Sequence, residues 1–206
     1  MIMKKQFLRG LIFGALATMG TGVSTLAQAD GTASLDLTVE ANITAGTCAA
    51  SVVDGETATN TIGFGNVYIS EVFAKTKVKP FKLRFSECAG LKDKTATVVL
   101  DHAASGGGCA GGNGQNAEFA NMSSSESKAA KVAVEVWTTE TPAGTNSVQL
   151  HCYNKNAQTV DLSAATSTTP VDFPLSARMA PVTGSALNTL TAGDFYSPTT
   201  FTITYQ

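Results

Sequence analysis

The sequence predicts an all-β protein, a sandwich of short strands, and three observations support this prediction. Segments in which apolar and polar residues alternate recur along the chain, and alternation with a period of two is typical of strands with one buried face. Residues that favour turns, chiefly glycine, proline, asparagine and aspartate, separate these segments. The helical signal is weak throughout, and only 15% of the residues are charged.

Residues 1–29 have the three-part pattern of a secretory signal peptide. The first nine residues carry three cations and no acid, residues 11–23 are apolar, and the triplet AQA at 27–29 supplies small residues where a signal peptidase reads them. We therefore predict cleavage before Asp30 and export of the remaining chain. A membrane anchor is the alternative, and we disfavour it because the apolar run is shorter than the roughly 20 residues that a transmembrane helix needs.

The exported part is long enough for one domain with its own core. Removing the three cations of the signal peptide changes the formal net charge from −2 to −5. A mildly acidic protein has no electrostatic reason to bind nucleic acid, so we expect no nucleic-acid partner. The exported part has no second long apolar segment, and we expect no membrane insertion.

The predicted strands differ in how they bury their side chains. In residues 78–88, Phe81, Leu83 and Phe85 share one face while Lys82 and Arg84 lie on the other. Two glycines in residues 61–69 indicate a bend or a bulge in that strand. Predicted strands occupy residues 35–43, 48–56, 61–69, 78–88, 95–102, 131–139, 147–154, 171–181 and 198–206.

Two segments do not fit the strand pattern. Residues 104–116, ASGGGCAGGNGQN, are predicted to form a loop, because glycine offers no side chain to pack. A phosphate-binding loop is the alternative, and we disfavour it because no Lys-Ser/Thr pair and no helix follow. Residues 124–133 could begin a helical turn, but they run directly into β-branched residues.

The sequence contains no pattern that indicates an enzyme. It has two histidines, no Gly-x-Ser-x-Gly, no His-Glu-x-x-His and only scattered single carboxylates, so we predict no catalytic residues and no cofactor. The four cysteines, Cys48, Cys88, Cys109 and Cys152, are most simply interpreted as disulfides in an oxidising compartment, with three possible pairings. A zinc site built from His102, Cys109, His151 and Cys152 is the alternative, which we disfavour against a Cys109–Cys152 disulfide because the spacing lacks a Cys-x-x-Cys knuckle.

Several residues together resemble the pilins of chaperone–usher pili, such as the subunits of type 1 and P pili. The resemblance covers essentially the whole exported chain. It begins with an alternating N-terminal arm, SLDLTVEANITAGTC, which ends at Cys48. Three further motifs follow in order: FKLRFSEC, which ends at Cys88, then FPLSARM, and the closing FTITYQ with Tyr205 next to last. The match implies residues 30–46 as a donor-strand extension and 47–206 as a pilin domain, an incomplete immunoglobulin-like sandwich that lacks its last strand.

The resemblance also implies how such a chain assembles. Its groove-filling residues would be Leu35, Leu37, Val39, Ala41 and Ile43 within the arm 34–44, with Ala41 where the family usually has glycine. The last strand would border an open groove, with Phe201, Ile203, Tyr205 and Gln206 contacting a periplasmic chaperone, and Tyr205 packing at the groove mouth with its hydroxyl in water. An outer-membrane usher would then export the chain into a surface fimbria made of this and other pilin subunits, which serves cell adhesion.

Two further expectations complete this interpretation. In the family the first two cysteines form a disulfide, which implies Cys48–Cys88 here, and Cys109–Cys152 is then an additional pair that a major pilin does not typically have. The alternative function is a secreted β-sandwich that binds carbohydrate through its loops, with Trp137, Tyr153 and Tyr196 stacking on sugar rings.

Overall fold

The computed structural model describes residue 41 and residues 44–206. The predicted signal peptide lies outside these residues, as do Leu35, Leu37, Val39 and Ile43 of the predicted arm. Within residues 44–206 no helix is long and apolar enough to cross a membrane.

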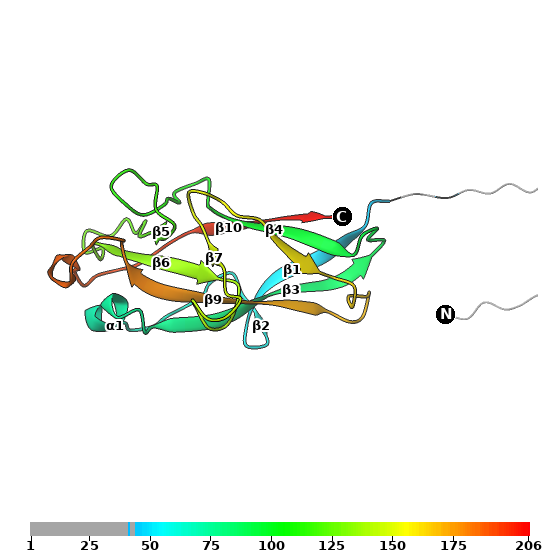
Figure 1. The fold of residues 1–206 in the computed structure, drawn as a ribbon, viewed down its shortest axis with the longest axis horizontal. Helices are drawn as coiled ribbons and strands as arrows, with labels where there is room; N and C mark the ends of the chain where they lie inside the picture. Colours follow the sequence, from blue (N-terminus) through cyan, green and yellow to red (C-terminus); the bar gives the residue numbers. More distant parts are fainter. Residues whose placement is uncertain (1–40, 42–43) are drawn as a thin grey trace, which may run out of the picture. The chain divides into compact units, whose positions relative to one another are not determined.

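Strands dominate the described residues, so the all-β prediction is confirmed (Figure 1). Two short helical segments interrupt them, α1 (Ile69–Phe73) and the 3-10 turn η1 (Leu187–Thr189). The strands are β1 (Thr47–Asp54), β2 (Thr57–Ala58), β3 (Val78–Ala89), β4 (Thr95–His102), β5 (Phe119–Ala120), β6 (Val132–Trp137), β7 (Gln149–Leu150), β8 (Gln158–Asp161), β9 (Val171–Pro181) and β10 (Thr199–Tyr205).

These strands form two antiparallel sheets. The larger has the order β2-β1-β3-β9-β6-β5, with β7 also pairing with β6, and the smaller has the order β10-β4-β8. The core lies between the sheets, because the alternating inward residues of β3 (Phe81, Leu83, Phe85) and of β4 (Ala96, Val98, Leu100) belong to one buried cluster. The face predicted for residues 78–88 is therefore the core face.

The prediction of a strand at residues 61–69 is wrong. These residues are irregular up to Tyr68 and then enter α1, where the Glu71 carboxylate accepts a 2.8 Å hydrogen bond from the Tyr68 N–H. A strand requires a neighbour, and none of the described strands pairs with this segment. Gly65, at φ = 63°, adds a left-handed residue that breaks the extended run.

Three shorter segments add detail to the predictions. The turn considered for residues 124–133 is present, with the Lys128 N–H donating to the Ser125 carbonyl, and the chain then enters β6 at Val132 without forming a helix. Only Gln149–Leu150 of the predicted strand 147–154 is paired, as β7. The strand β8 was not predicted, because four residues are too few to display an alternating pattern.

Two disulfides fasten the sandwich. Cys48–Cys88 joins the start of β1 to the end of β3, with Cα atoms 4.1 Å apart. Cys109–Cys152 ties the glycine-rich loop to the segment after β7, with Cα atoms 5.5 Å apart. Both pairings agree with the sequence interpretation. They also exclude the alternative zinc site, since neither Cys109 nor Cys152 keeps a free thiol to bind a metal.

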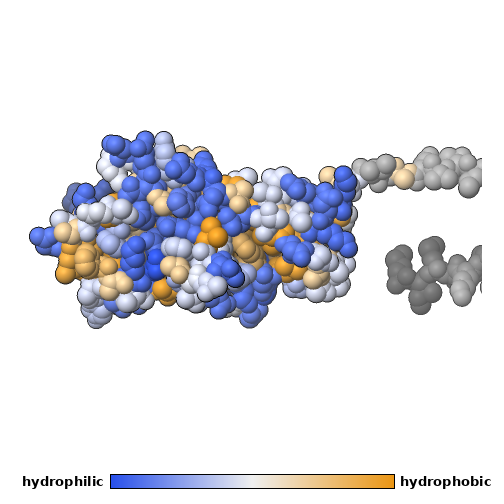
Figure 2. Space-filling model, viewed as in Figure 1, coloured by the Kyte–Doolittle hydropathy of each residue, from blue (hydrophilic) through white to orange (hydrophobic). Residues whose placement is uncertain are grey.

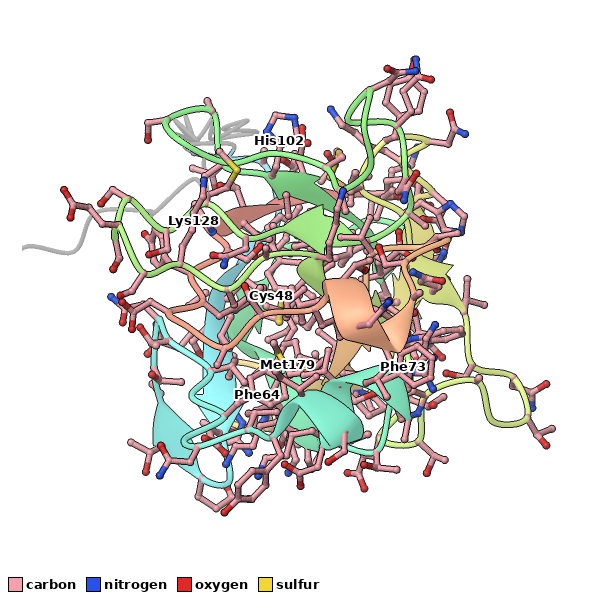
Figure 3. All side chains as sticks on the ribbon, turned by 90° about the vertical axis from the view of Figure 1, so that its left-hand side faces the viewer. Cys48, Phe64, Phe73, His102, Lys128 and Met179 are labelled. Carbon is pink, nitrogen blue, oxygen red and sulfur yellow. A yellow bond between two sulfur atoms is a disulfide. The ribbon has the colours of Figure 1, made fainter. Side chains whose placement is uncertain are left out.

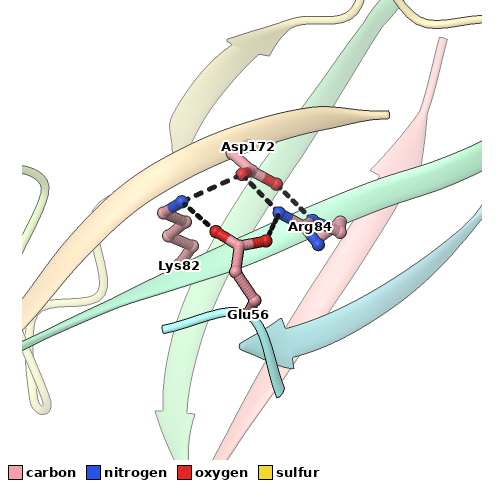
Figure 4. A network of polar contacts seen from close by, with 4 residues as sticks. All are labelled: Glu56, Lys82, Arg84 and Asp172. Carbon is pink, nitrogen blue, oxygen red and sulfur yellow. Dashed lines mark hydrogen bonds and ion pairs between the residues drawn. The ribbon is translucent and has the colours of Figure 1, made fainter. Parts of the chain in front are cut away.

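A polar network covers the outer face of β3 and β9 (Figure 4). Arg84 binds Asp172 through two parallel contacts, Nε–Oδ1 at 2.7 Å and Nη2–Oδ2 at 2.9 Å, and reaches Glu56 at 3.0 Å. Lys82 lies 3.4 Å from Glu56 and 3.3 Å from Asp172. The hydrogen bond from Arg84 lowers the pKa of Asp172 despite partial burial, so this carboxylate stays ionised.

Candidate functional site

The last strand, β10, has one paired and one unpaired edge. Residues 199–205 pair with β4 from Thr199 opposite His102 to Tyr205 opposite Ala96, and no described strand lies on the other side. The Gln206 N–H donates to the Thr95 carbonyl, and the Pro198 carbonyl accepts from the Ala103 N–H. The even-numbered residues of this strand therefore direct their main-chain groups toward β4. In an antiparallel ladder the alternate residues then direct their N–H and C=O groups to the free edge, so Phe201, Ile203 and Tyr205 present theirs there.

An apolar groove of about 780 Å³ lies beside the beginning of this strand. Residues 60–67 form one wall, with Ile62, Phe64 and Val67 half-buried along it. Residues 191–199 and Phe201 form the other wall. The floor consists of core side chains from both sheets, among them Phe81, Leu100, Val132, Val134, Val136 and Met179.

The three apolar side chains of β10 lie at different places along the groove. Phe201 lines the cavity itself. Ile203 and Tyr205 are half-buried against the core farther along the strand, while Thr200, Thr202 and Thr204 are exposed. The alternation in the closing sequence thus corresponds to one inward face and one solvent face, as the pattern predicts.

Tyr205 lies in a more specific environment than we expected. Its hydroxyl donates a 2.9 Å hydrogen bond to the Cys48 carbonyl, and its ring meets Phe85 edge to face with centroids 6.4 Å apart. Burial raises the pKa of its phenol. The hydroxyl thus has an acceptor within the protein, which the sequence did not indicate: Tyr205 joins β10 to β1 at the end of the strand away from the cavity.

Two residues, the polar Asn121 and the small Gly193, hold the wall formed by residues 191–199 in place. Asn121 donates 2.8 Å hydrogen bonds to the carbonyls of Ala129 and Asp194, and its side-chain oxygen accepts from the N–H groups of Ser123 and Tyr196. Gly193 packs so closely that a Cβ at this position would lie 1.9 Å from the Ser127 carbonyl oxygen. These contacts fix the wall against residues 127–129.

A buried ion pair supports the groove floor from the opposite face of β6. Glu135 is 2% exposed and binds Lys75 at 2.7 Å and Arg178 at 2.5 Å. Burial alone would raise the pKa of Glu135, but the hydrogen bonds from Lys75 and Arg178 outweigh burial and the pKa is lowered. These contacts hold β6 in place. Val134 and Val136, which flank Glu135 in the strand, therefore face the groove on the other side of β6.

The aromatic residues considered for carbohydrate binding occupy different environments. The Arg178 guanidinium lies over the Trp137 ring, 5.1 Å from the ring centroid. The indole N–H of Trp137 donates a 3.1 Å hydrogen bond to the Glu135 carboxylate. Tyr196 belongs to the groove lining, and Tyr153 is exposed on the loop after Cys152. Among residues 44–206 no three His, Cys, Asp or Glu side chains are grouped to hold a metal ion.

The sequence predicted the place of Phe201 at the groove, but it did not predict the rest of either wall. The segments 60–67 and 191–197, together with Asn121, carry no local motif, and only the folded sheets bring them together. The apolar Ile62, Phe64 and Val67 were visible in the sequence but were attributed to an ordinary strand.

Comparison with known proteins identifies the family. The uncharacterized fimbrial-like protein YadL of Escherichia coli (strain K12) is 43% identical over 176 residues, which are 85% of this chain and 86% of that protein. The chain belongs to the fimbrial-like proteins. It is accordingly a structural pilus subunit and a component of a surface fimbria, not an enzyme, and the predicted all-β sandwich is confirmed. No protein-family model matches the sequence.

Three solved structures are similar to this chain at low identity. The P pilus rod subunit PapA has a TM-score of 0.48 and 18% identity, covering 77% of this chain and 99% of PapA. A chaperone–usher pilus structure has a TM-score of 0.48 and 18% identity, covering 89% of this chain and 99% of its own. The CupB6 tip adhesin of Pseudomonas aeruginosa has a TM-score of 0.42 and 16% identity, covering 61% of this chain and 30% of CupB6.

Proposed function

We propose that this fimbrial subunit polymerises by donor-strand exchange, with the arm of one subunit filling the groove of the next. The observation that supports the proposal is the apolar groove of about 780 Å³ beside the unpaired edge of β10. An added strand would bond to the free main-chain groups of Phe201, Ile203 and Tyr205 and would cover the apolar floor. Both gains are needed, because an open strand edge above an exposed core invites aggregation.

The arm has the chemistry to fill this groove. Leu35, Leu37, Val39, Ala41 and Ile43 recur at every second position between Ser34 and Thr44, so an extended arm directs all five to one face. The residues between them are polar, which suits the solvent side of an added strand. Ala41 is the smallest of the five and would meet the most crowded point of the groove.

Before assembly the groove needs a temporary occupant. In this proposal a periplasmic chaperone lends a strand to β10, contacting Phe201, Ile203, Tyr205 and Gln206, and an outer-membrane usher then exchanges it for a subunit arm. The exported fimbria serves cell adhesion. The secretory signal predicted at residues 1–29 is consistent with this route.

A charge placed on one face of the arm tests the proposal. Val39→Asp directs a carboxylate into an apolar groove where it has no partner, so assembly into fibres should be lost while the subunit still accepts an arm. Thr38→Asp is the matched control, because it adds the same charge one residue away on the solvent face and should assemble normally. Fibres sheared from the cell surface are quantified for both variants. Normal fibres from Val39→Asp would refute the assignment of the arm.

A further inference from the structure

One end of the sandwich carries exposed apolar side chains that the groove does not use. Phe73, the last residue of α1, is 43% exposed, and Leu187, the first residue of η1, is 48% exposed. The two helical segments contact each other, and Figure 3 shows Phe73 beside η1 in the end-on view. Figure 2 shows apolar residues at the surface of this end. We call Phe73 and Leu187 the end patch.

The end patch lies where the groove opens. Ile69 and Val72 of α1 line the groove, while Phe73 of the same helix points away from it. Phe64 and Met179 also line the groove. Any chain that enters or leaves the groove at this end passes directly beside the patch.

The opposite end of the sandwich is where a subunit's own arm departs. β10 runs from Thr199, near the cavity, to Tyr205, which bonds to Cys48 at the start of β1. Figure 1 places α1 and η1 at one end and the start of β1 at the other. Gly46 is fixed at that second end, since a Cβ on it would lie 2.2 Å from the Gly90 carbonyl oxygen.

The direction of the inserted arm decides which ends meet. All the strand pairings in residues 44–206 are antiparallel. An arm that continues this pattern runs opposite to β10 and ends near Thr199, at the end patch. A parallel arm would instead bring the donor domain to the end from which the acceptor's own arm departs, and the fibre could not propagate head to tail.

The distance left for a linker is short. Two residues, Ala45 and Gly46, separate the arm's last residue, Thr44, from β1. At about 3.3–3.6 Å per residue, Gly46 of the donor lies within roughly 7 Å of Thr44. The donor domain must therefore touch the acceptor at the end of the groove. Its touching end has a small recess, where Leu91, Leu162 and Ala165 lie beside Lys94.

We propose that the end patch of Phe73 and Leu187 is a docking surface for a second copy of this chain, which it contacts at the end where Gly46 lies beside Gly90. The inference rests on the proposed function, because the inserted arm brings the two ends together. Docking adds a domain–domain contact to the strand pairing, and it explains why two large apolar side chains remain exposed beside the groove.

Two measurements on the complete chain, prepared as monomers by dissociating exported fibres in denaturant and refolding them in dilute solution, test the inference. The first is fibre formation, followed by sedimentation, and the second is uptake of a labelled peptide comprising residues 34–44, followed by size-exclusion chromatography. Leu187→Glu should slow fibre formation by about tenfold or more, because a carboxylate would replace an apolar side chain at the contact and lose its water there. Uptake of the peptide, which lacks a domain, should be unchanged. Phe73→Glu should behave in the same way.

The matched control is Val148→Glu. Val148 is 41% exposed but precedes β7, which pairs with the end of β6 remote from η1, so both measurements should equal those of the unmodified protein. Normal fibre formation by Leu187→Glu and Phe73→Glu would overturn the docking surface while leaving strand exchange intact. Loss of peptide uptake in these variants would also overturn it, since the patch would then support the groove. Failure of the unmodified protein to take up the peptide would refute the proposed function itself.

Discussion

Replacing Tyr205 by phenylalanine isolates the hydrogen bond that joins β10 to β1. The substitution removes the hydroxyl that donates to the Cys48 carbonyl at 2.9 Å. It retains the ring, and with it the edge-to-face contact with Phe85. The Cys48 carbonyl keeps a long 3.4 Å contact from the Thr47 hydroxyl. The variant therefore separates the polar contribution of Tyr205 from its packing.

The expected loss is about 1–2 kcal/mol of unfolding free energy. A typical intramolecular hydrogen bond contributes about 0.5–1.5 kcal/mol, and a buried acceptor left without a partner costs about 1–3 kcal/mol. Cys48 is 8% exposed, so water only partly replaces the lost donor. In a chain of this length such a loss corresponds to a decrease of about 3–6 °C in Tm.

Urea denaturation followed by the fluorescence of Trp137, the single tryptophan, measures this loss. With both disulfides intact, Tyr205→Phe should lower the midpoint without changing the slope, because the surface exposed on unfolding is the same. Thr202→Val is the control, since it removes a hydroxyl from the solvent face of the same strand. If Tyr205→Phe were as stable as the unmodified protein, the bond would contribute nothing to joining the two strands.

Two further predictions concern polar contacts away from β10. Asn121→Ala removes four hydrogen bonds that hold the groove wall and should cost about 2–4 kcal/mol in urea denaturation, with weaker uptake of the 34–44 peptide. Because its pKa is lowered on folding, Asp172 contributes stability above its unfolded pKa of about 3.9, and this stability is lost as the pH falls through the folded pKa. Asp172→Asn should therefore reduce stability at neutral pH and flatten its decline below about pH 4, as measured by denaturation across a pH series.

Much of the sheet structure could be predicted because the strands carry their own pattern. The sequence 171–181 became β9 with the predicted bounds, and β3 buried the predicted Phe81, Leu83 and Phe85. Residues 61–69 misled the same reasoning. They have a strand-like composition, but a strand is defined by its partner, and alternation alone contains no information about a partner.

The candidate site was predictable only where it is local in the chain. Phe201 follows from the alternation of the last strand, whereas Gly193 and the segment 60–67 reach the groove, and Asn121 supports its wall, through long-range packing. The Tyr205–Cys48 bond spans 157 positions of sequence, and no spacing rule relates such residues. The strand that borders the groove could therefore be predicted from the sequence, whereas the other residues of the cavity could not, because they meet only in the folded protein.

The position of the Cys48–Cys88 disulfide has a mechanical consequence. A pulling force applied at Gly46 enters the domain at Thr47 and reaches a covalent crosslink at the next residue. The crosslink transfers the load to the end of β3, which lies between β1 and β9 inside the larger sheet. β1 therefore cannot be peeled off from its first residue, because unzipping its hydrogen bonds from that end would require rupture of a sulfur–sulfur bond. Tension along a fibre would instead load the hydrogen bonds between β3 and its neighbours β1 and β9 in shear. In shear these bonds must break together, whereas in unzipping they break one at a time.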